Sequence, residues 1–450
     1  MRGWGGHTPR LSEQSEPHVS RGRHAGVLRV NQAFSDNPPA GVPAVGRDAG
    51  ASRIRAAAPA AMLVSIATLE DLGVTEARSE VVVGVMDELI DTPAVGRLGQ
   101  VLSDHGVTPV KLRDAEGAVD GKRLRQRVDT VRDALLADLP PEYGETAAVV
   151  RAAFEDQEFT GWTLWPVSEA VVARALASGL DRDFDDAMGV LSVLTTRLTA
   201  EFAIRPMLNA RFERALEIAR QWTGDEDAAV RRLASEGTRS HLQWGKGVPA
   251  LRQRPGATRT IVDALYRDES EDVRRSVANH VNDLSRDDPD LAAEIVGGWL
   301  DSPDANTPRV ARHALRTLVK QGHPKALELM GFTGAQFEVD GPTIASLEVP
   351  LGDAVRFTAH VTNTCPETAR AAIDFVLHFR KARGALAPKV FKVGSRTIEP
   401  GETVDIAKSY SFRPRTTRTF NPGEHVIELQ VNGRTFGRGA FRLVAREGTP

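Results

Sequence analysis

The sequence has almost no cysteine and no long hydrophobic run, and each absence excludes a class of protein. Cys365 is the only cysteine among 450 residues, so the chain cannot form an internal disulfide or a zinc site built from several cysteines. It has no run of about 18 apolar residues, which a membrane-spanning helix needs. We therefore expect a cytoplasmic protein in a reducing compartment, without membrane association and without a metal or other cofactor.

Charge of neither sign is in excess over the whole chain, but charge is segregated locally. The net charge is −3, so overall composition does not indicate a polyanionic partner. Residues 136–158 nonetheless contain six acids and one base, whereas residues 229–255 contain six bases and one acid. The second segment is typical of a surface that contacts an anion, and its single acid is Glu236.

Residues 1–61 lack a periodic apolar pattern and are rich in Arg, Gly, Pro and Ala. This composition predicts disorder. The Arg-rich beginning is like that of a transit peptide, but it contains several acids, and the apolar core of a secretory signal is missing. We interpret residues 1–61 as a disordered extension before Met62. Whether it arises from an upstream start of translation is left open.

Between about residues 80 and 330, apolar residues recur three and four positions apart, which predicts helices. DAAVRRLASEGTRS, EDVRRSVANHVND and TPRVARHALRTLVKQ share a phrase. Their aligned valines, Val230, Val273 and Val310, are 43 and 37 residues apart. This is the period of HEAT-type helical pairs, which stack into a solenoid. We therefore predict a HEAT-like helical domain over residues 62–332.

From about residue 334 the period of the apolar pattern becomes two, as in AVRFTAHV, IDFVLHF and HVIELQV, which predicts strands. Asn432 and Gly433 stand between two such runs and are typical of a two-residue hairpin. The region favours an immunoglobulin-like sandwich over residues 333–450, with a short barrel as the alternative. The predicted fold is therefore an all-α HEAT-like helical solenoid followed by a small all-β immunoglobulin-like sandwich.

Helical spacing places acids among bases on one flank of the three shared phrases. At about 100° per residue, Val230, Leu233, Ala234 and Gly237 form one buried stripe. The positions two, six and ten after each aligned valine lie along one flank of this stripe. In a solenoid, equivalent flanks line one surface. The flank contains Arg232, Glu236 and Ser240, then Arg275, Asn279 and Asp283, then Arg312, Arg316 and Lys320. This predicts a largely basic surface with two acids, Glu236 and Asp283, set in it.

Each of these residues also has a purely structural interpretation. Arg232 and Glu236 can form an ordinary ion pair four residues apart on a solvated face. Asp283 can end its helix, and Trp244 can pack in the core, although the Gly-Lys-Gly that follows it disfavours a buried helix or strand there. For the basic flank, a phosphate-binding surface and a merely solvated face are both open.

EFAIRPML at 201–208, together with VRRLASEGTR at 230–239, resembles the AlkC-type DNA alkylation-repair glycosylases of the AlkC/AlkD HEAT-like superfamily. GWTLWPVSE, VRRSVANHVNDLSRDDPD and HALRTLVKQGHPKALELMGF extend the resemblance over residues 130–332. PKVFKV, TTRTFNPGEH and LQVNG resemble the immunoglobulin-like domain of one AlkC subgroup. Residues 1–125 match weakly or not at all, and the segment around His241 is poorer in Pro and Arg than the family pattern.

The resemblance implies a monofunctional DNA glycosylase that hydrolyses the N-glycosidic bond of cationic N-alkylated bases, such as N3-methylcytosine and N3-methyladenine, in duplex DNA. It places catalytic residues at Glu201, Glu236 and Asp283 and a lesion-contacting residue at Trp244. The chemistry suits these types, because a carboxylate stabilises a cationic deoxyribose or positions the attacking water, and a tryptophan face attracts a cation. We assign the central role to Asp283. For Glu201, a structural pair with Arg205 is the alternative.

The implied partner is double-stranded DNA containing alkylated bases, bound by a monomer without an obligate protein partner and associated with the nucleoid. Cations beside the acids would hold the phosphates. The expected backbone contacts are Arg231, Arg232, Arg239, Lys246, Arg275, Arg312, Arg316 and Lys320, with Arg415 and Arg418 in the β domain. A basic loop of that domain is expected to make a clamp, the alternative being a solvated loop. The alternative function is a non-catalytic HEAT-repeat scaffold or DNA-binding protein.

Overall fold

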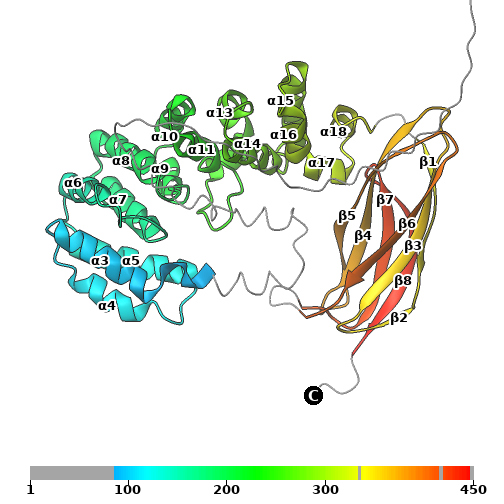
Figure 1. Ribbon diagram of the computed structural model, residues 1–450, viewed down its shortest axis with the longest axis horizontal. Coiled ribbons are helices and arrows are strands. Elements are labelled where there is room, and N and C mark those ends of the chain that lie inside the picture. The colour runs from blue at the N-terminus through cyan, green and yellow to red at the C-terminus, as the bar shows by residue number, and fades with distance from the viewer. Residues whose placement is uncertain (1–85, 333–335, 415–418, 446–450) are drawn as a thin grey trace, which may run out of the picture. The chain divides into compact units, whose positions relative to one another are not determined.

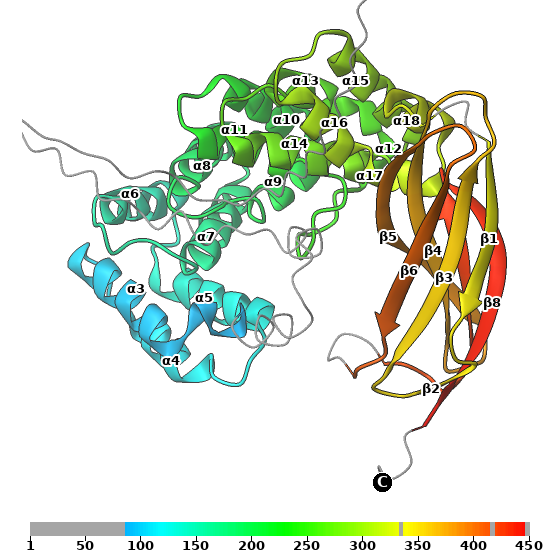
Figure 2. The ribbon, with the colours of Figure 1, turned by 45° about the vertical axis from the view of Figure 1, so that its right-hand side comes forward.

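The structure, a computed structural model, describes residues 86–332, 336–414 and 419–445. These residues form a helical part followed by a β part (Figures 1 and 2). The predicted extension over residues 1–61 and the first residues of the predicted helical domain lie outside the described ranges. Within those ranges, no helix has the length and apolar character that crossing a membrane requires.

The helical part consists of short helices joined by tight turns. Many of them bury one apolar face in a common core. In chain order they are η1 (Glu88–Ile90), α3 (Thr92–Asp104), α4 (Val110–Ala118), α5 (Leu124–Asp138), α6 (Tyr143–Phe154), α7 (Leu164–Ser178), α8 (Asp181–Leu194), α9 (Ile204–Ala210), α10 (Phe212–Gln221), η2 (Trp222–Gly224), α11 (Ala228–Glu236), α12 (Pro249–Gln253), η3 (Pro255–Thr258), α13 (Arg259–Leu265), α14 (Glu271–Leu284), α15 (Pro289–Asp301), α16 (Thr307–Ala314), α17 (Arg316–Gln321) and α18 (Pro324–Leu329).

The helices that carry the shared phrase are neighbours. α11 packs against α14, and α14 packs against α16 (Figures 1 and 2). The aligned valines Val230, Val273 and Val310 are all buried, so the predicted apolar stripe is confirmed. Equivalent positions of α11 and α14 therefore face the same interface, and this arrangement brings distant parts of the sequence together.

The third phrase does not form one helix, as its periodicity predicts, but two. The helix breaks at Leu315, between α16 and α17. At the break, the guanidinium of Arg316 donates to the carbonyl of His313 at 2.7 Å, and the side chain of Asn282 accepts from the amide of Thr317 at 3.3 Å. Side chains thus satisfy backbone groups that a continuous helix would pair, and periodicity alone does not reveal this.

α14 is buried along most of its length, including its polar residues. Val273, Val277 and Val281 recur every four residues on its apolar face. Every residue from Ser276 to Leu284 is also buried. A helix with polar residues on its buried side needs partners for them, and on α14 some of these partners come from α11 and the loop after it.

The β part is built from two sheets that enclose a second core. The strands are β1 (Phe337–Ile344), β2 (Glu348–Pro350), β3 (Ala354–Asn363), β4 (Ala369–Arg380), β5 (Leu386–Ile398), β6 (Thr403–Ser411), β7 (Gly423–Val431) and β8 (Arg434–Val444). One sheet has the order β1-β3-β6 and the other β2-β8-β7-β4-β5. Alternate residues of β3, with Phe375 and Leu429 from the second sheet, fill the space between them. This is the arrangement of a sandwich.

The predicted Asn-Gly hairpin is confirmed. Val431 of β7 pairs with Arg434 of β8, which leaves Asn432 and Gly433 as a two-residue loop. Both have positive φ, 48° and 77°. A type I′ turn needs positive φ at both of its central residues, and Asn and Gly are the residues that adopt it most readily.

Candidate active site

Glu236 and Asp283 lie at the interface of α11 and α14, where one arginine binds both. Arg239, three residues after Glu236, donates from Nε to Asp283 Oδ2 at 2.8 Å and lies within 2.7 Å of the same oxygen through Nη2. Its Nη1 donates to Glu236 Oε1. The two acids are 2% and 3% exposed. The structure therefore joins the two acids of the predicted flank through a buried guanidinium.

Glu236 is surrounded by donors. Its Oε2 accepts from the Ser276 hydroxyl at 2.6 Å and lies 3.8 Å from Arg232 Nη2. Burial would raise the pKa of Glu236, but Arg239, Arg232 and Ser276 outweigh it and lower the pKa to about 2. Glu236 is therefore negatively charged at neutral pH.

Asp283 has the opposite balance. Burial raises the pKa of Asp283 above its ordinary value more than Arg239 lowers it. The residue also stands in the last turn of α14, where the helix dipole disfavours an anion. Its Oδ2 is taken by Arg239, whereas Oδ1 lies 3.9 Å from Arg286, beyond hydrogen-bond distance, and no described residue donates to it. Oδ1 is thus the oxygen of Asp283 that has no hydrogen-bond donor among the described residues.

Glu201 joins the same cluster from the segment before α9. Its Oε2 accepts from Thr199 Oγ1 at 2.7 Å and from Arg232 Nη1 at 3.0 Å. The structural alternative, a pair with Arg205, is not what forms. The described cluster alternates acid and base in the order Glu201, Arg232, Glu236, Arg239, Asp283. Arg286 Nη2 also lies 3.9 Å from Asp283 Oδ1, so with all of these groups ionised the three acids are matched by three arginines.

Arg205 fixes the loop between α11 and α12. It is fully buried and donates to three backbone carbonyls, those of Gly237, Arg239 and Lys246, at 3.2, 2.5 and 2.8 Å. Burial and two neighbouring arginines lower the pKa of Arg205 to about 10. Asn209 adds a bond to the carbonyl of Gly247 at 3.0 Å. Because this loop carries Arg239, its anchoring also fixes the bridge between the two acids.

Trp244 projects from the same loop. It is 50% exposed and has φ of 61°, so it is neither in the core nor in a relaxed backbone conformation. A positive φ is unfavourable for a bulky side chain. An exposed aromatic ring held by a strained backbone is a feature that clusters at binding sites.

Comparisons with known proteins place the chain among relatives in sequence and fold. A family profile described as "Uncharacterised protein YhaZ, C-terminal Ig-like domain" matches residues 338–445. The chain is 32% identical over 311 residues to "Uncharacterized protein YhaZ" of Bacillus subtilis, covering 69% of this chain and 84% of that protein. It is also 31% identical to a solved structure, "Pseudomonas fluorescens alkylpurine DNA glycosylase AlkC bound to DNA containing an abasic site analog", with a TM-score of 0.72. That match covers 80% of this chain and 99% of the other.

The chain belongs to the AlkC family. Its β part is the immunoglobulin-like domain of the matching profile, and its helical part precedes that domain. The resemblance seen in the sequence is thereby confirmed.

The predicted phosphate contacts of this AlkC-family chain separate into two groups. Some are occupied within the protein: Arg231 pairs with Asp268 at 2.6 Å, Arg232 with Glu201, Arg239 with both acids, Arg275 with Asp272 at 3.0 Å, and Arg316 with Asn279 at 3.1 Å. Lys246 and Arg312 are exposed, and Lys320 is half-buried. Arg415 and Arg418 lie outside the described residues.

Two buried residues near the site were not found from the sequence. Ser276 contacts Glu236 directly, and His280 lies one turn further along α14. Ser276 and His280 stand three and seven residues after Val273, one position beyond the flank that contains Arg275 and Asn279, so the spacing that selects Asp283 does not select them.

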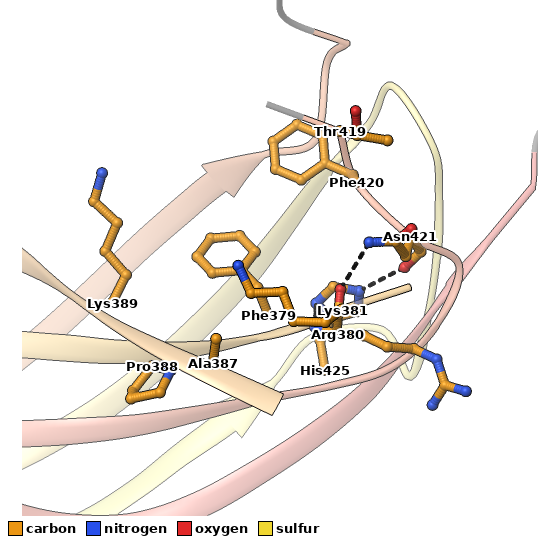
Figure 3. Close-up of a pocket in the computed structure, with 10 residues that line it drawn as sticks. All are labelled: Phe379, Arg380, Lys381, Ala387, Pro388, Lys389, Thr419, Phe420, Asn421 and His425. Atoms are coloured by element: carbon orange, nitrogen blue, oxygen red, sulfur yellow. Dashed lines mark hydrogen bonds between the residues drawn. The ribbon is translucent and has the colours of Figure 1, made fainter. Parts of the chain in front are cut away.

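A shallow pocket of about 180 Å³ lies where β4 and β5 meet the segment before β7 (Figure 3). Phe379 and Phe420 line it, and Lys381 and Lys389 stand at its edge. His425 below them is buried and bonded to the carbonyl of Asn421 at 3.0 Å. The lining residues include no acid, so the pocket favours an anion.

Across the described ranges, no group of three or more His, Cys, Asp or Glu side chains has an arrangement that could hold a metal ion. Glu201, Glu236 and Asp283 are instead separated by arginines.

Proposed function

We propose that the chain is a monofunctional DNA glycosylase, which hydrolyses the N-glycosidic bond of cationic N-alkylated bases such as N3-methylcytosine and N3-methyladenine in duplex DNA. The observation that carries this proposal is the meeting of Glu201, Glu236 and Asp283 in one buried cluster, in which Asp283 Oδ1 has no hydrogen-bond donor among the described residues. The AlkC relative, whose printed description is an alkylpurine DNA glycosylase bound to DNA, supports it.

The cluster suits a reaction in which positive charge develops. An alkylated cationic base is a good leaving group, and its departure leaves an oxocarbenium-like sugar. At about 4 Å and an effective dielectric near 20, a carboxylate stabilises such a charge by about 4 kcal/mol. If this interaction forms in the transition state only, it accelerates the reaction roughly a thousandfold.

Asp283 takes the central role in this proposal. Its Oδ1 has no described donor and its pKa is raised, so it can face the sugar and position or accept a proton from the attacking water. Glu236 supplies a fixed negative charge, and Glu201 holds Arg232 beside it. Trp244 presents its ring to the damaged nucleotide.

Duplex DNA is the proposed partner of the whole chain, bound by a monomer. We take residues 62–332 as a HEAT-like catalytic domain, residues 333–450 as the immunoglobulin-like domain, and residues 1–61 as an extension. Lys246, Arg312 and Lys320 are the cations of the helical domain proposed to hold phosphates. The acid-free pocket edged by Lys381 and Lys389 supports a further DNA contact in the immunoglobulin-like domain.

The test is base excision from a panel of duplex oligonucleotides, each with one alkylated base. Wild-type protein should release N3-methylcytosine or N3-methyladenine, so that alkali cleaves the strand at the resulting abasic site. A monofunctional enzyme should produce no strand cleavage before alkali is added. The alternative, a scaffold or DNA-binding protein without catalysis, predicts binding that is indifferent to Asp283→Asn and no base release from any lesion.

A further inference from the structure

A hydrogen-bonded row of neutral groups lies behind Glu236. Ser276 Oγ donates to Glu236 Oε2 at 2.6 Å, and Ser235 Oγ lies 3.0 Å from Ser276 Oγ. His280 Nδ1 is 3.5 Å from Ser235 Oγ, and His280 Nε2 is 2.9 Å from Thr258 Oγ1. All of these residues are buried, and the row runs from α14 and η3 to the carboxylate on α11.

One direction in the row is fixed by chemistry. A carboxylate accepts and cannot donate, so the single hydrogen of Ser276 points to Glu236 at 2.6 Å. Ser276 Oγ can then only accept from Ser235 Oγ, 3.0 Å away. In the tautomer of His280 that carries its hydrogen on Nδ1, the imidazole donates toward Ser235 and accepts from Thr258 through Nε2, and the donors of the row then all point toward Glu236.

His280 keeps this arrangement because it is neutral. Burial and the nearby Arg239 lower the pKa of His280 to about 3. A protonated imidazole would donate from both nitrogens and could not accept from Thr258. At neutral pH one nitrogen of His280 therefore stays available to accept a hydrogen bond in the row.

We propose that Ser276, supported by Ser235 and His280, is a positioning residue that orients Glu236 and keeps its negative charge in place during catalysis. Glu236 is otherwise held on its Oε1 side by Arg239, so Ser276 fixes the second oxygen. Without it, the carboxylate can turn about its terminal bond. This inference rests on the proposed glycosylase activity and adds a residue that does not itself touch the substrate.

The charge of Glu236 is set by groups from every element that packs on it. The ionisable groups around Glu236 are Arg232 on α11, Arg239 on the following loop, His280 and Asp283 on α14, Arg205 on α9, and Glu201 before it. Substitution of Ser276 removes one neutral donor and leaves all of these groups in place, so it tests the orientation of Glu236 rather than the net charge.

The experiment measures single-turnover excision of N3-methylcytosine from duplex DNA. Ser276→Ala should slow excision roughly ten- to a hundredfold, the range for loss of a hydrogen bond to a charged group. Affinity for a duplex with a stable abasic-site analogue should be unchanged. Ser276→Cys, which keeps the size and a weak donor, should fall between. Ser168→Ala is the matched control, since Ser168 is also buried on a helix but bonds only a carbonyl, at 2.6 Å.

A double-mutant cycle separates positioning from damage to the fold. In a Glu236→Gln background, Ser276→Ala should slow excision by less than about threefold further, because the charge on which Ser276 acts is gone. An equal loss in both backgrounds, or wild-type rates for Ser276→Ala, would overturn the inference while leaving the proposed function intact. Absence of excision by the wild-type protein on every lesion would overturn the proposed function, and this inference with it.

Discussion

At the scale of single residues, the two central acids share one arginine but differ in the ease with which they take up a proton. Arg239 contacts both acids. Glu236 also accepts a hydrogen bond from Ser276 and lies near Arg232, whereas Asp283 stands at the negative end of the α14 dipole. Their pKa values therefore move in opposite directions. Paired titratable groups whose environments separate their pKa values commonly divide the work of catalysis.

The raised pKa of Asp283 predicts an acidic limb in the rate of excision. If the reaction needs ionised Asp283, the rate falls as the pH falls through its raised pKa, above the ordinary value of about 4 for an aspartate. Glu236, with a pKa of about 2, contributes no limb in the same range. Single-turnover excision rates measured from about pH 4.5 upward test this dependence on pH. A profile that is flat there, or an identical limb in Asp283→Asn, would contradict the assignment.

Substitution of Trp244 should slow excision without lowering the melting temperature of the protein. Trp244→Gly removes an exposed ring and relieves a positive φ, so the melting temperature should stay the same or rise slightly. Excision should slow roughly two- to thirtyfold, as expected from losing a cation–π contact of about 0.5–2 kcal/mol. Thermal denaturation and excision are measured on the same preparation. A large fall in the melting temperature would show that the ring has a structural role.

At the scale of elements, the loop between α11 and α12 carries the residues whose interpretation changes most. The composition of this segment is typical of a surface that contacts an anion, but its two cations, Arg239 and Lys246, do not behave alike. Arg239 turns inward to the acids, and Arg205 from α9 holds the loop by its carbonyls. Lys246, in contrast, is exposed.

Arg239 and Lys246 should respond differently to the same substitution. Arg239→Gln leaves two buried carboxylates without their shared partner, and we expect a loss of about 3–5 kcal/mol in the free energy of unfolding. Lys246→Gln should change it by less than about 0.5 kcal/mol. Urea denaturation of both variants tests this. Equal, small effects would mean that the bridge between the acids does not stabilise the free protein.

The division into a helical and a β part, and two acids of the cluster, Glu236 and Asp283, are predictable from the sequence because they follow from local spacing. The valine period places α11 beside α14, and counting along the helix selects Glu236 and Asp283. The partners of those acids are not predictable in this way. Arg239 lies beyond the end of α11, and its direction depends on the carbonyl contacts of Arg205. Likewise, the break at Leu315 depends on Asn282, a residue distant in sequence.

At the scale of the whole molecule, the proposed DNA binding requires a near-neutral chain to contact a polyanion through its exposed cations. Several arginines of the predicted flank already have acidic partners. We therefore expect exposed residues such as Arg312 and Lys246 to contact the phosphates. Binding should therefore weaken steeply with salt, but with a slope smaller than the full set of predicted cations would give.

Salt dependence distinguishes the two groups of arginines. Arg312→Ala should reduce the slope of log affinity against log salt concentration by about one, as expected for one lost phosphate contact. Arg231→Ala should leave the slope unchanged but lower stability, because Arg231 pairs with buried Asp268. Fluorescence anisotropy with labelled duplex DNA at several salt concentrations measures both. The opposite pattern would show that Arg231 leaves its partner to contact DNA.

The most direct test of the account is single-turnover excision of N3-methylcytosine and N3-methyladenine from duplex DNA by wild-type protein and Asp283→Asn. We expect base release by the wild-type protein and a loss of at least about a hundredfold in the variant, the scale of removing a carboxylate that stabilises developing charge. Both proteins should bind an abasic-site duplex. Full excision by Asp283→Asn, or no excision of either base by the wild-type protein, would contradict the central claim.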